Sequence, residues 1–359
     1  MKRKTFDLKL GYSCNNKCFH CVVEPYKMMT PKNKMDYTYK EIIATIDSPD
    51  VKESNTIVLT GGEPTIRPDF LNILKYINKR YKDKGICLQT NGRKLSQYLD
   101  EIKNMGLKIS YVIAVHGPEE IHNDITGIKN NEEVNPFKET MESIKKLISL
   151  YGDFKKVARA EIVLSQKNLN YLSETVEFLL KEGVDFIAIS YPHLDGYELI
   201  SPEEVRKRGF PYKWLRKELK KITEIAYKNP ELIIEFEALP ICAIRDEEGN
   251  IYDLPSNFRL TDYKINESVS VKYPGNKYVK DHISSWEKIH YKPEICYECA
   301  IESNCIGIWK ETYTCIGIEG LEHIKREELF KIPTILNVNN VFSFKKGGKI
   351  NDTCNNKCC

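Results

Sequence analysis

The sequence lacks a charge imbalance, a long hydrophobic run and an export signal. Its 54 lysine and arginine residues nearly balance 51 aspartate and glutamate residues, so composition predicts neither nucleic-acid binding nor attraction to an acidic membrane. No apolar run approaches the roughly 20 residues that a membrane-spanning helix needs, and the first residues do not resemble a signal peptide. We therefore expect a globular cytoplasmic protein with no nucleic-acid partner and no membrane contact.

Cysteine, in contrast, is abundant. The chain of 359 residues contains 12 cysteines, and in a long chain without an export signal these indicate metal or redox chemistry more than disulfides. Only Cys87 and Cys242 stand alone. The others form three groups: Cys14, Cys18 and Cys21; Cys296, Cys299, Cys305 and Cys315; and Cys354, Cys358 and Cys359.

The first two hundred residues alternate strand-like and helix-like segments. Short runs rich in β-branched and apolar residues predict strands. The six strands are expected at about 5–11, 55–60, 85–90, 109–116, 157–164 and 185–191. Helical stretches lie between them, with apolar residues three and four positions apart, as in the segments that begin at Phe70 and at Phe137.

This alternation predicts an α/β fold. Right-handed crossovers would roll the strands into a partial (β/α)6 parallel barrel with its ligands at the carboxyl ends of the strands. After about residue 230 the alternation stops, and Pro274-Gly275-Asn276 indicates a hairpin. We therefore expect a barrel over residues 1–230, a small metal-stapled domain over 231–330 and a flexible cysteine-containing tail over 331–359.

The first cysteine group directly follows the first predicted strand. A cubane iron–sulfur cluster needs four ligands to be closed, and Cys14-Asn-Asn-Lys-Cys18-Phe-His-Cys21 supplies only three thiolates. One iron of a 4Fe–4S cluster would then stay open to an external ligand. The alternative is a structural zinc site, but His20 lies between two of the cysteines, where it could not easily complete a tetrahedron.

This Cys-x3-Cys-x2-Cys run after a first strand resembles the signature of the radical S-adenosylmethionine (SAM) superfamily. The resemblance implies that SAM binds the open iron through its amino and carboxylate groups. One-electron cleavage of SAM then yields a 5'-deoxyadenosyl radical that abstracts hydrogen from a substrate. The implied cofactors are a 4Fe–4S cluster and SAM, and the implied electron donor is a ferredoxin, a flavodoxin or a reductase.

Two further motifs support the resemblance. Gly61-Gly62-Glu63-Pro64, directly after the second predicted strand, resembles the family's Gly-Gly-Glu-Pro motif. Its glycines allow another group to approach the backbone closely, and its carboxylate can accept hydrogen bonds from the ammonium group of the methionine part of SAM. Asn91, in Thr-Asn-Gly after the third strand, resembles a family position near SAM. Either motif by itself would be an ordinary turn.

Several side chains near later strand ends are candidates for the cofactor or substrate site. His116-Gly-Pro, followed by His-x-Asp and Thr-Gly, resembles the peptide-modifying branch of the family and would place His116 at the cofactor mouth. A histidine that caps the strand explains it equally well. The candidates for substrate contact are Arg159, Glu161, Tyr191 and His193. For each of them a structural role is the simpler alternative.

The second cysteine group resembles the carboxy-terminal extensions called twitch or SPASM domains. Cys296, Cys299 and Cys305 have a C-x2-C-x5-C spacing that can converge on one metal site. We expect Cys242 as the fourth ligand of a single auxiliary 4Fe–4S cluster, with Cys315 as the alternative ligand or a plain buried thiol. A zinc site has compatible spacing. For the tail cysteines Cys354, Cys358 and Cys359 three alternatives stay open: ligation of another metal, electron exchange as a dithiol, or no role. A further hypothesis is that the tail occupies the substrate path.

The resemblance favours a maturase that abstracts hydrogen from a ribosomally made peptide to form a crosslink, a thioether or an epimerised centre. Many such enzymes carry an N-terminal winged-helix segment, whereas the first strand is expected here within about the first six residues. We therefore expect either leader binding by a separate protein or a small substrate. One alternative is a radical SAM enzyme that acts on a nucleotide, sugar or cofactor precursor. Another is a non-catalytic iron–sulfur carrier or scaffold.

Overall fold

The computed structural model describes residues 3–128, 134–194, 196–197, 200–252, 254–260, 267–272, 278–279, 290–303 and 305–331. In these residues the main element is a sheet with the strand order β10-β9-β1-β2-β3-β4-β5-β6-β7-β8. Neighbouring strands from β9 to β8 are parallel, and β10 is antiparallel to β9. The strands are β1 (Arg3–Lys9), β2 (Thr56–Thr60), β3 (Gly85–Thr90), β4 (Ile109–Ala114), β5 (Ala158–Val163), β6 (Phe186–Ser190), β7 (Ile233–Glu237), β8 (Phe258–Leu260), β9 (Glu267–Lys272) and β10 (Tyr278–Val279).

The six predicted strands correspond to β1 to β6, and the predicted α/β fold is confirmed. The expectation that the alternation ends near residue 230 is wrong, because β7 and β8 continue the parallel sheet after α10 (Arg216–Lys228). The antiparallel β9–β10 pair confirms the hairpin, whose turn lies outside the described residues. The division into domains stays a prediction.

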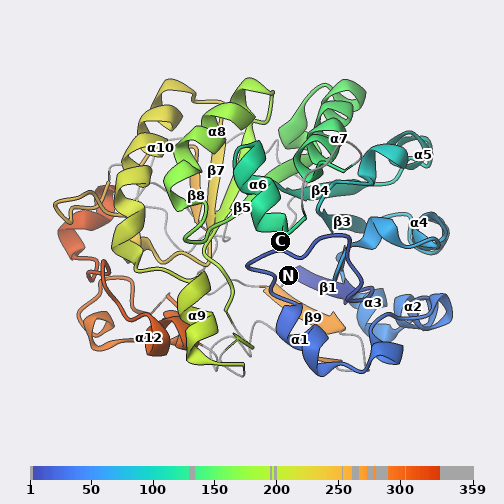
Figure 1. Ribbon diagram of the computed structural model, residues 1–359, viewed down its shortest axis with the longest axis horizontal. Helices are drawn as coiled ribbons and strands as arrows, with labels where there is room; N and C mark the ends of the chain where they lie inside the picture. Colours follow the sequence, from blue (N-terminus) through green and yellow to red (C-terminus); the bar gives the residue numbers. More distant parts are fainter. Residues whose placement is uncertain are drawn as a thin grey trace.

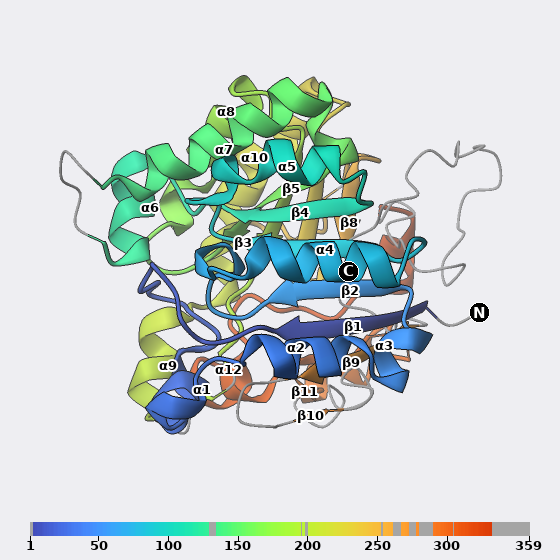
Figure 2. The same ribbon diagram turned by 90° about the vertical axis from the view of Figure 1, so that its right-hand side faces the viewer.

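Helices cover the outer face of the sheet. Figure 1 shows them as an arc around the strands, and Figure 2 shows α2 and α4 across the outer side of β1 to β3. Besides short 3₁₀ helices, the remaining α-helices of the described residues are α1 (Glu24–Met29), α2 (Tyr39–Ile46), α3 (Pro49–Glu53), α4 (Phe70–Arg80), α5 (Leu99–Asn104), α6 (Glu119–Thr126), α7 (Pro136–Tyr151), α8 (Leu172–Lys181), α9 (Pro202–Arg208) and α12 (Lys310–Cys315).

Local sequence explains the limits of these helices. The side chain of Asn135 caps α7 by accepting from the Lys138 backbone N–H, Pro136 occupies the first turn, and Gly152 ends the helix with a φ of 75°. The predicted apolar stripe of α7 is buried against the sheet. The helix predicted to begin at Phe70 likewise buries one apolar face.

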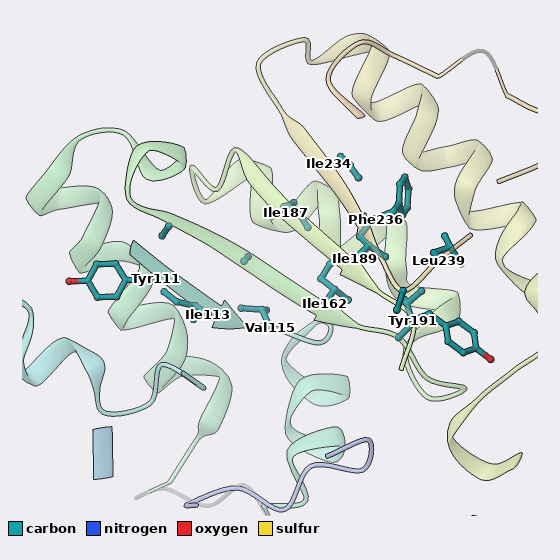
Figure 3. Packing of buried hydrophobic residues seen from close by; sticks show 14 of the residues in the cluster. Tyr111, Ile113, Val115, Ile162, Ile187, Ile189, Tyr191, Ile234, Phe236 and Leu239 are labelled. Carbon is teal, nitrogen blue, oxygen red and sulfur yellow. The ribbon is translucent and has the colours of Figure 1, made fainter. Parts of the chain in front are cut away.

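The main hydrophobic core lies between the sheet and these helices. Alternate residues of each strand point outward into it. Figure 3 shows this packing for the strands β4 to β7. Its labelled members are Tyr111, Ile113, Val115, Ile162, Ile187, Ile189, Tyr191, Ile234, Phe236 and Leu239.

The inner face of the sheet has a different character. The residues that alternate with the core positions include Arg159 and Glu161 on β5 and Glu235 and Glu237 on β7. A separate small apolar cluster consists of Val58, Cys87 and Val112 on β2, β3 and β4. The inner face therefore offers a polar, charged surface beside a small apolar one, as expected of a ligand site more than of a packed core.

The covalent chain requires the sheet to curve. Leu260 ends β8 and Glu267 begins β9, and a chain of seven residues spans at most about 25 Å. In a flat sheet the same two strands, separated by β1 to β7, would lie about 38 Å apart at 4.8 Å per strand. In the described residues β8 and β10 are the sheet edges, so the barrel is partial, as predicted.

The described part of the chain after residue 290 packs beside the barrel. It contains the two-stranded sheet β11 (His290–Tyr291) and β12 (Ile308–Trp309), followed by α12. Helix α12 packs against α9. Arg206 of α9 donates to the Cys315 carbonyl at 3.2 Å, and Arg216 binds Glu322 at 2.9 Å. These contacts join the segment after β12 to α9 and to the start of α10.

Candidate iron–sulfur and SAM site

Residues 10–23, here called the cysteine loop, leave the carboxyl end of β1 and pack against the loop that follows β2. The Gly62 N–H donates to the Gly11 carbonyl at 2.7 Å, and the Glu63 N–H donates to the Ser13 carbonyl at 2.9 Å. A Cβ atom on Gly62 would lie 2.1 Å from the Ser13 oxygen, and Gly61 has a φ of +129°. Glycine is therefore required at both positions by the close approach of the two backbones.

Glu63 links the loops after β2 and β3. One oxygen of its buried carboxylate accepts from the Thr65 backbone and hydroxyl and from the Thr90 hydroxyl, at 3.0, 2.6 and 2.7 Å. The other accepts from the Asn91 N–H at 2.7 Å. Burial raises the pKa of Glu63, while these hydrogen bonds act in the opposite direction. Beside its predicted SAM role, Glu63 thus holds the two loops together.

Asn91 connects this assembly to the first cysteine group. Its Nδ2 donates to Asn15 Oδ1 at 2.7 Å and lies 3.8 Å from Cys14 Sγ. The structure therefore brings the predicted SAM-binding residues Gly61, Gly62, Glu63 and Asn91 together with the cysteine loop. A cavity of about 290 Å³ lies beside Gly62 and Glu63, but Asn91 and the cysteines do not line it, so we do not place SAM there.

The thiols of Cys14, Cys18 and Cys21 lie near one another at one site. Burial raises the pKa of all three thiols, to about 11 for Cys14. The charge of Cys21 raises the pKa of Cys14 further, and the charges of Cys21 and Cys14 raise that of Cys18. Backbone N–H groups lower the pKa values again. The Asn16 N–H donates to Cys14 Sγ at 3.3 Å, and the backbone N–H groups of Val23 and Glu24 lower the pKa of Cys21. Buried thiols with N–H donors fit an iron–sulfur cluster, whose thiolates are stabilised by the metal and by such hydrogen bonds.

The second cysteine group also converges. Burial raises the pKa of Cys242, and the thiols of Cys305, Cys296 and Cys299 raise it further. Backbone N–H groups again point at sulfur: Gly307 donates to Cys305 at 3.3 Å, and Ile324 donates to Cys299 at 3.4 Å. The structure thus brings Cys242 to these three cysteines, and the preference for Cys242 over Cys315 as the fourth ligand stays a prediction. The tail cysteines lie outside the described residues.

Replacement of Cys242 and of Cys315 tests that preference. We expect Cys242→Ala to lower the iron content of the reconstituted protein by about four atoms per chain, the content of one cubane cluster. Cys315→Ala is the matched control and should keep the iron of the unchanged protein. Iron and sulfide assays after anaerobic reconstitution measure both. Loss of iron in Cys315→Ala alone would instead make Cys315 the ligand.

In the part of the chain that is described, no group of three or more histidine, cysteine, aspartate or glutamate side chains is arranged so that it could hold a metal ion. We therefore propose cluster ligation by the two cysteine groups from three features: their residue types, the proximity of the thiols within each group and the N–H groups that point at sulfur.

Three buried histidines contact one another at the cysteine loop: His20 belongs to the loop, and His116 and His122 come from the segment after β4. The ring of His116 meets that of His20 edge-on at 4.5 Å and stacks on that of His122 at 5.8 Å. Its Nδ1 accepts from the Val163 N–H at 3.3 Å. Burial lowers the pKa of His116 to about 4, so its ring is neutral at pH 7. His116 thus adjoins the cysteine loop, and its contact with SAM stays a prediction.

The inner face carries a network of charged side chains. Arg159 Nη1 lies 2.5 Å from Glu235 Oε1 and 2.6 Å from Glu237 Oε1. Ser190 donates to Glu161 at 3.0 Å and to Glu237 at 3.3 Å. Burial raises the pKa of Glu161, and Glu237 raises it further. The predicted candidates Arg159 and Glu161 therefore share one buried, predominantly acidic site.

Glu235 gives this network a measurable pH dependence. Burial is the main cause that raises its pKa from 4.5 to about 7, against the effect of Arg159. The folded protein thus keeps a proton that the unfolded chain releases between these pH values, so this contribution to stability is lost as pH rises through the interval. We expect Glu235→Gln to gain stability relative to the unchanged protein from pH 5 to pH 8, measured by urea unfolding.

The exposed Glu231, close before β7, is the control. Glu231→Gln removes a carboxylate on the surface and should not reproduce this gain. A constant stability difference between Glu235→Gln and the unchanged protein across the series would contradict the prediction.

The other two substrate candidates have structural contacts. Tyr191 is wholly buried, donates to the Phe210 carbonyl at 2.8 Å and stacks on Tyr212 at 4.9 Å. His193 packs on Trp309 with the ring centres 4.6 Å apart. Tyr191 therefore belongs to the core, and His193 joins the barrel to β12.

Sequence reasoning missed the residues that support the cysteine loop from other elements. Arg93 and Arg208 donate to its backbone, and the Lys17 and Phe19 N–H groups donate to the Thr126 and Ile125 carbonyls at the end of α6, both at 2.8 Å. The glutamates of β7 had a visible signal, since charged residues alternate with apolar ones in Ile-Ile-Glu-Phe-Glu. Arg208 had none.

Residues 8–179 match the model of the Radical SAM superfamily, and the chain therefore contains a radical SAM domain. It is 28% identical over 177 residues to the probable GTP 3',8-cyclase of Sulfurisphaera tokodaii, covering 49% of this chain and 52% of the relative. The chain thus spans about half the length of the first curated relatives that it matches.

Solved structures share the fold over most of the chain. Streptococcus suis SuiB bound to the precursor peptide SuiA has a TM-score of 0.59 at 13% identity, covering 90% of this chain and 75% of SuiB. Native anSMEcpe with bound AdoMet and Cp18Cys peptide has a TM-score of 0.56 at 15% identity, covering 92% of this chain and 95% of that chain. None of the helices in the described residues has both the length and the apolar character needed to cross a bilayer.

Proposed function

We propose that this chain is a radical SAM enzyme in which Cys14, Cys18 and Cys21 hold a 4Fe–4S cluster with one open iron. When bound, the cluster and SAM supply a 5'-deoxyadenosyl radical that abstracts hydrogen from the substrate. The radical SAM domain and the convergence of the three thiols support this proposal.

The surrounding residues bind and orient the cofactors. Gly61 and Gly62 let the loop after β2 approach the cysteine loop, and Glu63 fixes the position of the Asn91 backbone. Asn91 in turn lies against the Cys14 sulfur. The buried His20 and His116 rings help to exclude water from one side of the loop.

The first test is anaerobic reconstitution with iron and sulfide, followed by addition of SAM and dithionite. We expect about eight irons per chain, the content of two cubane clusters, and release of 5'-deoxyadenosine detected by mass spectrometry. A protein that binds iron but releases no 5'-deoxyadenosine would contradict the enzyme proposal and favour a carrier or scaffold.

For the substrate we propose a ribosomally made peptide. The observation that carries this choice is the acidic inner face, where Glu161, Glu235 and Glu237 surround Arg159. Arg159 is already paired with Glu235 and Glu237, so a polyanion such as a nucleoside triphosphate would find no unpaired cation among these four residues. A neutral or basic side chain can hydrogen-bond to the carboxyl groups whether or not they carry a proton. The fold likeness to SuiB, solved with its precursor peptide, agrees with the same choice.

The second candidate is a small molecule. The observation in its favour is the 28% identity to GTP 3',8-cyclase relatives over about half of the chain. To separate the candidates, the reconstituted protein is given SAM and dithionite with either GTP or a short peptide encoded beside its gene. Modification of the peptide, seen as a mass change, supports the first candidate, and consumption of GTP supports the second and contradicts the peptide proposal.

The remaining partners follow from this proposal. A ferredoxin, a flavodoxin or a reductase would supply the electron, and a separate protein would bind the peptide leader. The second cysteine group would hold a closed auxiliary cluster, suited to electron transfer or to positioning, in a twitch-like domain. These assignments and the cytoplasmic location stay predictions.

A further inference from the structure

Arg93 ties the first half of the cysteine loop to the barrel. It follows the Thr-Asn-Gly turn after β3, and only 9% of its surface is exposed. Its Nη1 donates to the Asn15 carbonyl at 2.6 Å and to Asn16 Oδ1 at 2.9 Å. Its Nε binds Glu139 of α7 at 2.6 Å. One guanidinium thus joins the residues directly after Cys14 to a helix on the outside of the sheet.

Arg208 ties the second half of the loop to α9. Its Nε donates to the Phe19 carbonyl at 2.7 Å, and Glu204 neutralises it at 2.5 Å. Its guanidinium lies 4.1 Å from the centre of the Tyr197 ring, and the Tyr197 hydroxyl donates to the Cys21 carbonyl at 2.8 Å. Phe19 lies between Cys18 and Cys21, so this contact holds the segment that contains both.

We propose that Arg93 and Arg208 are positioning residues for the candidate cluster, which hold its loop from two sides and raise its reduction potential. The inference rests on the cluster proposed for Cys14, Cys18 and Cys21, but not on the nature of the substrate.

Electrostatics explains the effect on the potential. Reduction adds one negative charge to the cluster, and a guanidinium stays positive at every working pH. Arg93 is paired with Glu139, and Arg208 is paired with Glu204, which Lys207 also contacts at 2.9 Å. Removal of either arginine therefore makes the net charge beside the loop more negative by one. Net charge and hydrogen bonding near a cluster set its potential. Loss of either arginine therefore disfavours the reduced state.

The test compares glutamine and lysine replacements at each position. Arg93→Gln and Arg208→Gln remove the charge, whereas Arg93→Lys and Arg208→Lys keep it without the planar fork of donors. The full chain is reconstituted without substrate, and the midpoint potential is measured by a redox titration followed by electron paramagnetic resonance. The signal that changes on addition of SAM identifies the cluster with the open iron.

We expect both glutamine variants to shift the midpoint potential to more negative values and both lysine variants to stay near the unchanged protein. SAM cleavage should fall about tenfold or more in the glutamine variants, as is typical when a partner of a metal ligand is lost. Arg80→Gln is the matched control, because it also breaks an arginine–carboxylate pair, with Asp47, at the far end of α4.

The outcomes separate this inference from the proposed function. If the protein without substitutions takes up no iron, the assignment of a cluster to Cys14, Cys18 and Cys21 is wrong. Glutamine variants with full iron and an unshifted potential would overturn the role of the arginines. If a glutamine variant lacks about four irons per chain, the content of one cubane cluster, retention of that iron by its lysine counterpart supports positioning by a charged donor. Iron loss in both, together with a lowered unfolding temperature, would mean a merely structural role and overturn the proposal.

Discussion

Cys18→Ala is expected to abolish SAM cleavage and to leave the fold intact. Cys18 is the central residue of the first group, and the electrostatic effects on its thiol come from Cys21 and Cys14. Without it two thiolates remain, which is too few to hold a cubane with one open iron. The main hydrophobic core does not include Cys18, so loss of the thiol should not unfold the barrel.

The measurements are 5'-deoxyadenosine release, iron content and the circular dichroism spectrum of the anaerobically reconstituted protein. Cys87→Ala is the control, because Cys87 is a buried cysteine on β3 outside both groups. It should keep 5'-deoxyadenosine release. SAM cleavage that survives Cys18→Ala would show that the cluster is held by other residues.

Gly127→Ala is expected to reduce SAM cleavage by about 100-fold, the loss typical of a reacting group displaced by an ångström. Gly127 ends α6 with a φ of +65°, and a Cβ atom there would lie 2.6 Å from the Lys17 carbonyl oxygen. That contact would push Lys17 away from α6 and break its hydrogen bond to Thr126. Since Lys17 adjoins Cys18, the cysteine loop would move.

Gly152→Ala supplies the matched control for this prediction. Gly152 ends α7 in the same left-handed conformation, with a φ of +75°, but a Cβ atom there meets nothing within 4 Å. Both variants bear the cost of alanine in this conformation, about 1 kcal/mol. Only Gly127→Ala should also lose SAM cleavage and iron. Equal effects of the two variants on SAM cleavage would mean that backbone strain alone is responsible.

The parallel sheet was predictable where its strands are apolar and regularly spaced. All six expected strands are present because runs such as Thr56–Thr60 are buried on both faces and are too short for helices. The expectation failed at β7, where two glutamates interrupt the apolar pattern. Both glutamates face the barrel interior, where they pair with Arg159 of β5, and a local pattern cannot reveal that partner.

Much of the candidate site was predictable for a different reason. A parallel sheet brings the carboxyl ends of its strands to one edge, so motifs directly after β1, β2 and β3 must meet. Cys14, Gly62, Glu63 and Asn91 do so. The contacts of Arg208 with Phe19 and Tyr197 were not predictable, because they join the early loop to a helix nearly two hundred residues later.

The sequence by itself determined the residue types that chemistry needs and the strand after which each one stands. Three cysteines on one loop, paired glycines and an acid after the next strand are local facts, set by spacing along the chain. Tertiary structure alone decided which buried charges pair, which thiols converge and which glycine lies against the cysteine loop. These depend on distances between segments far apart in the chain, which only the curvature of the sheet and the packing of its helices set.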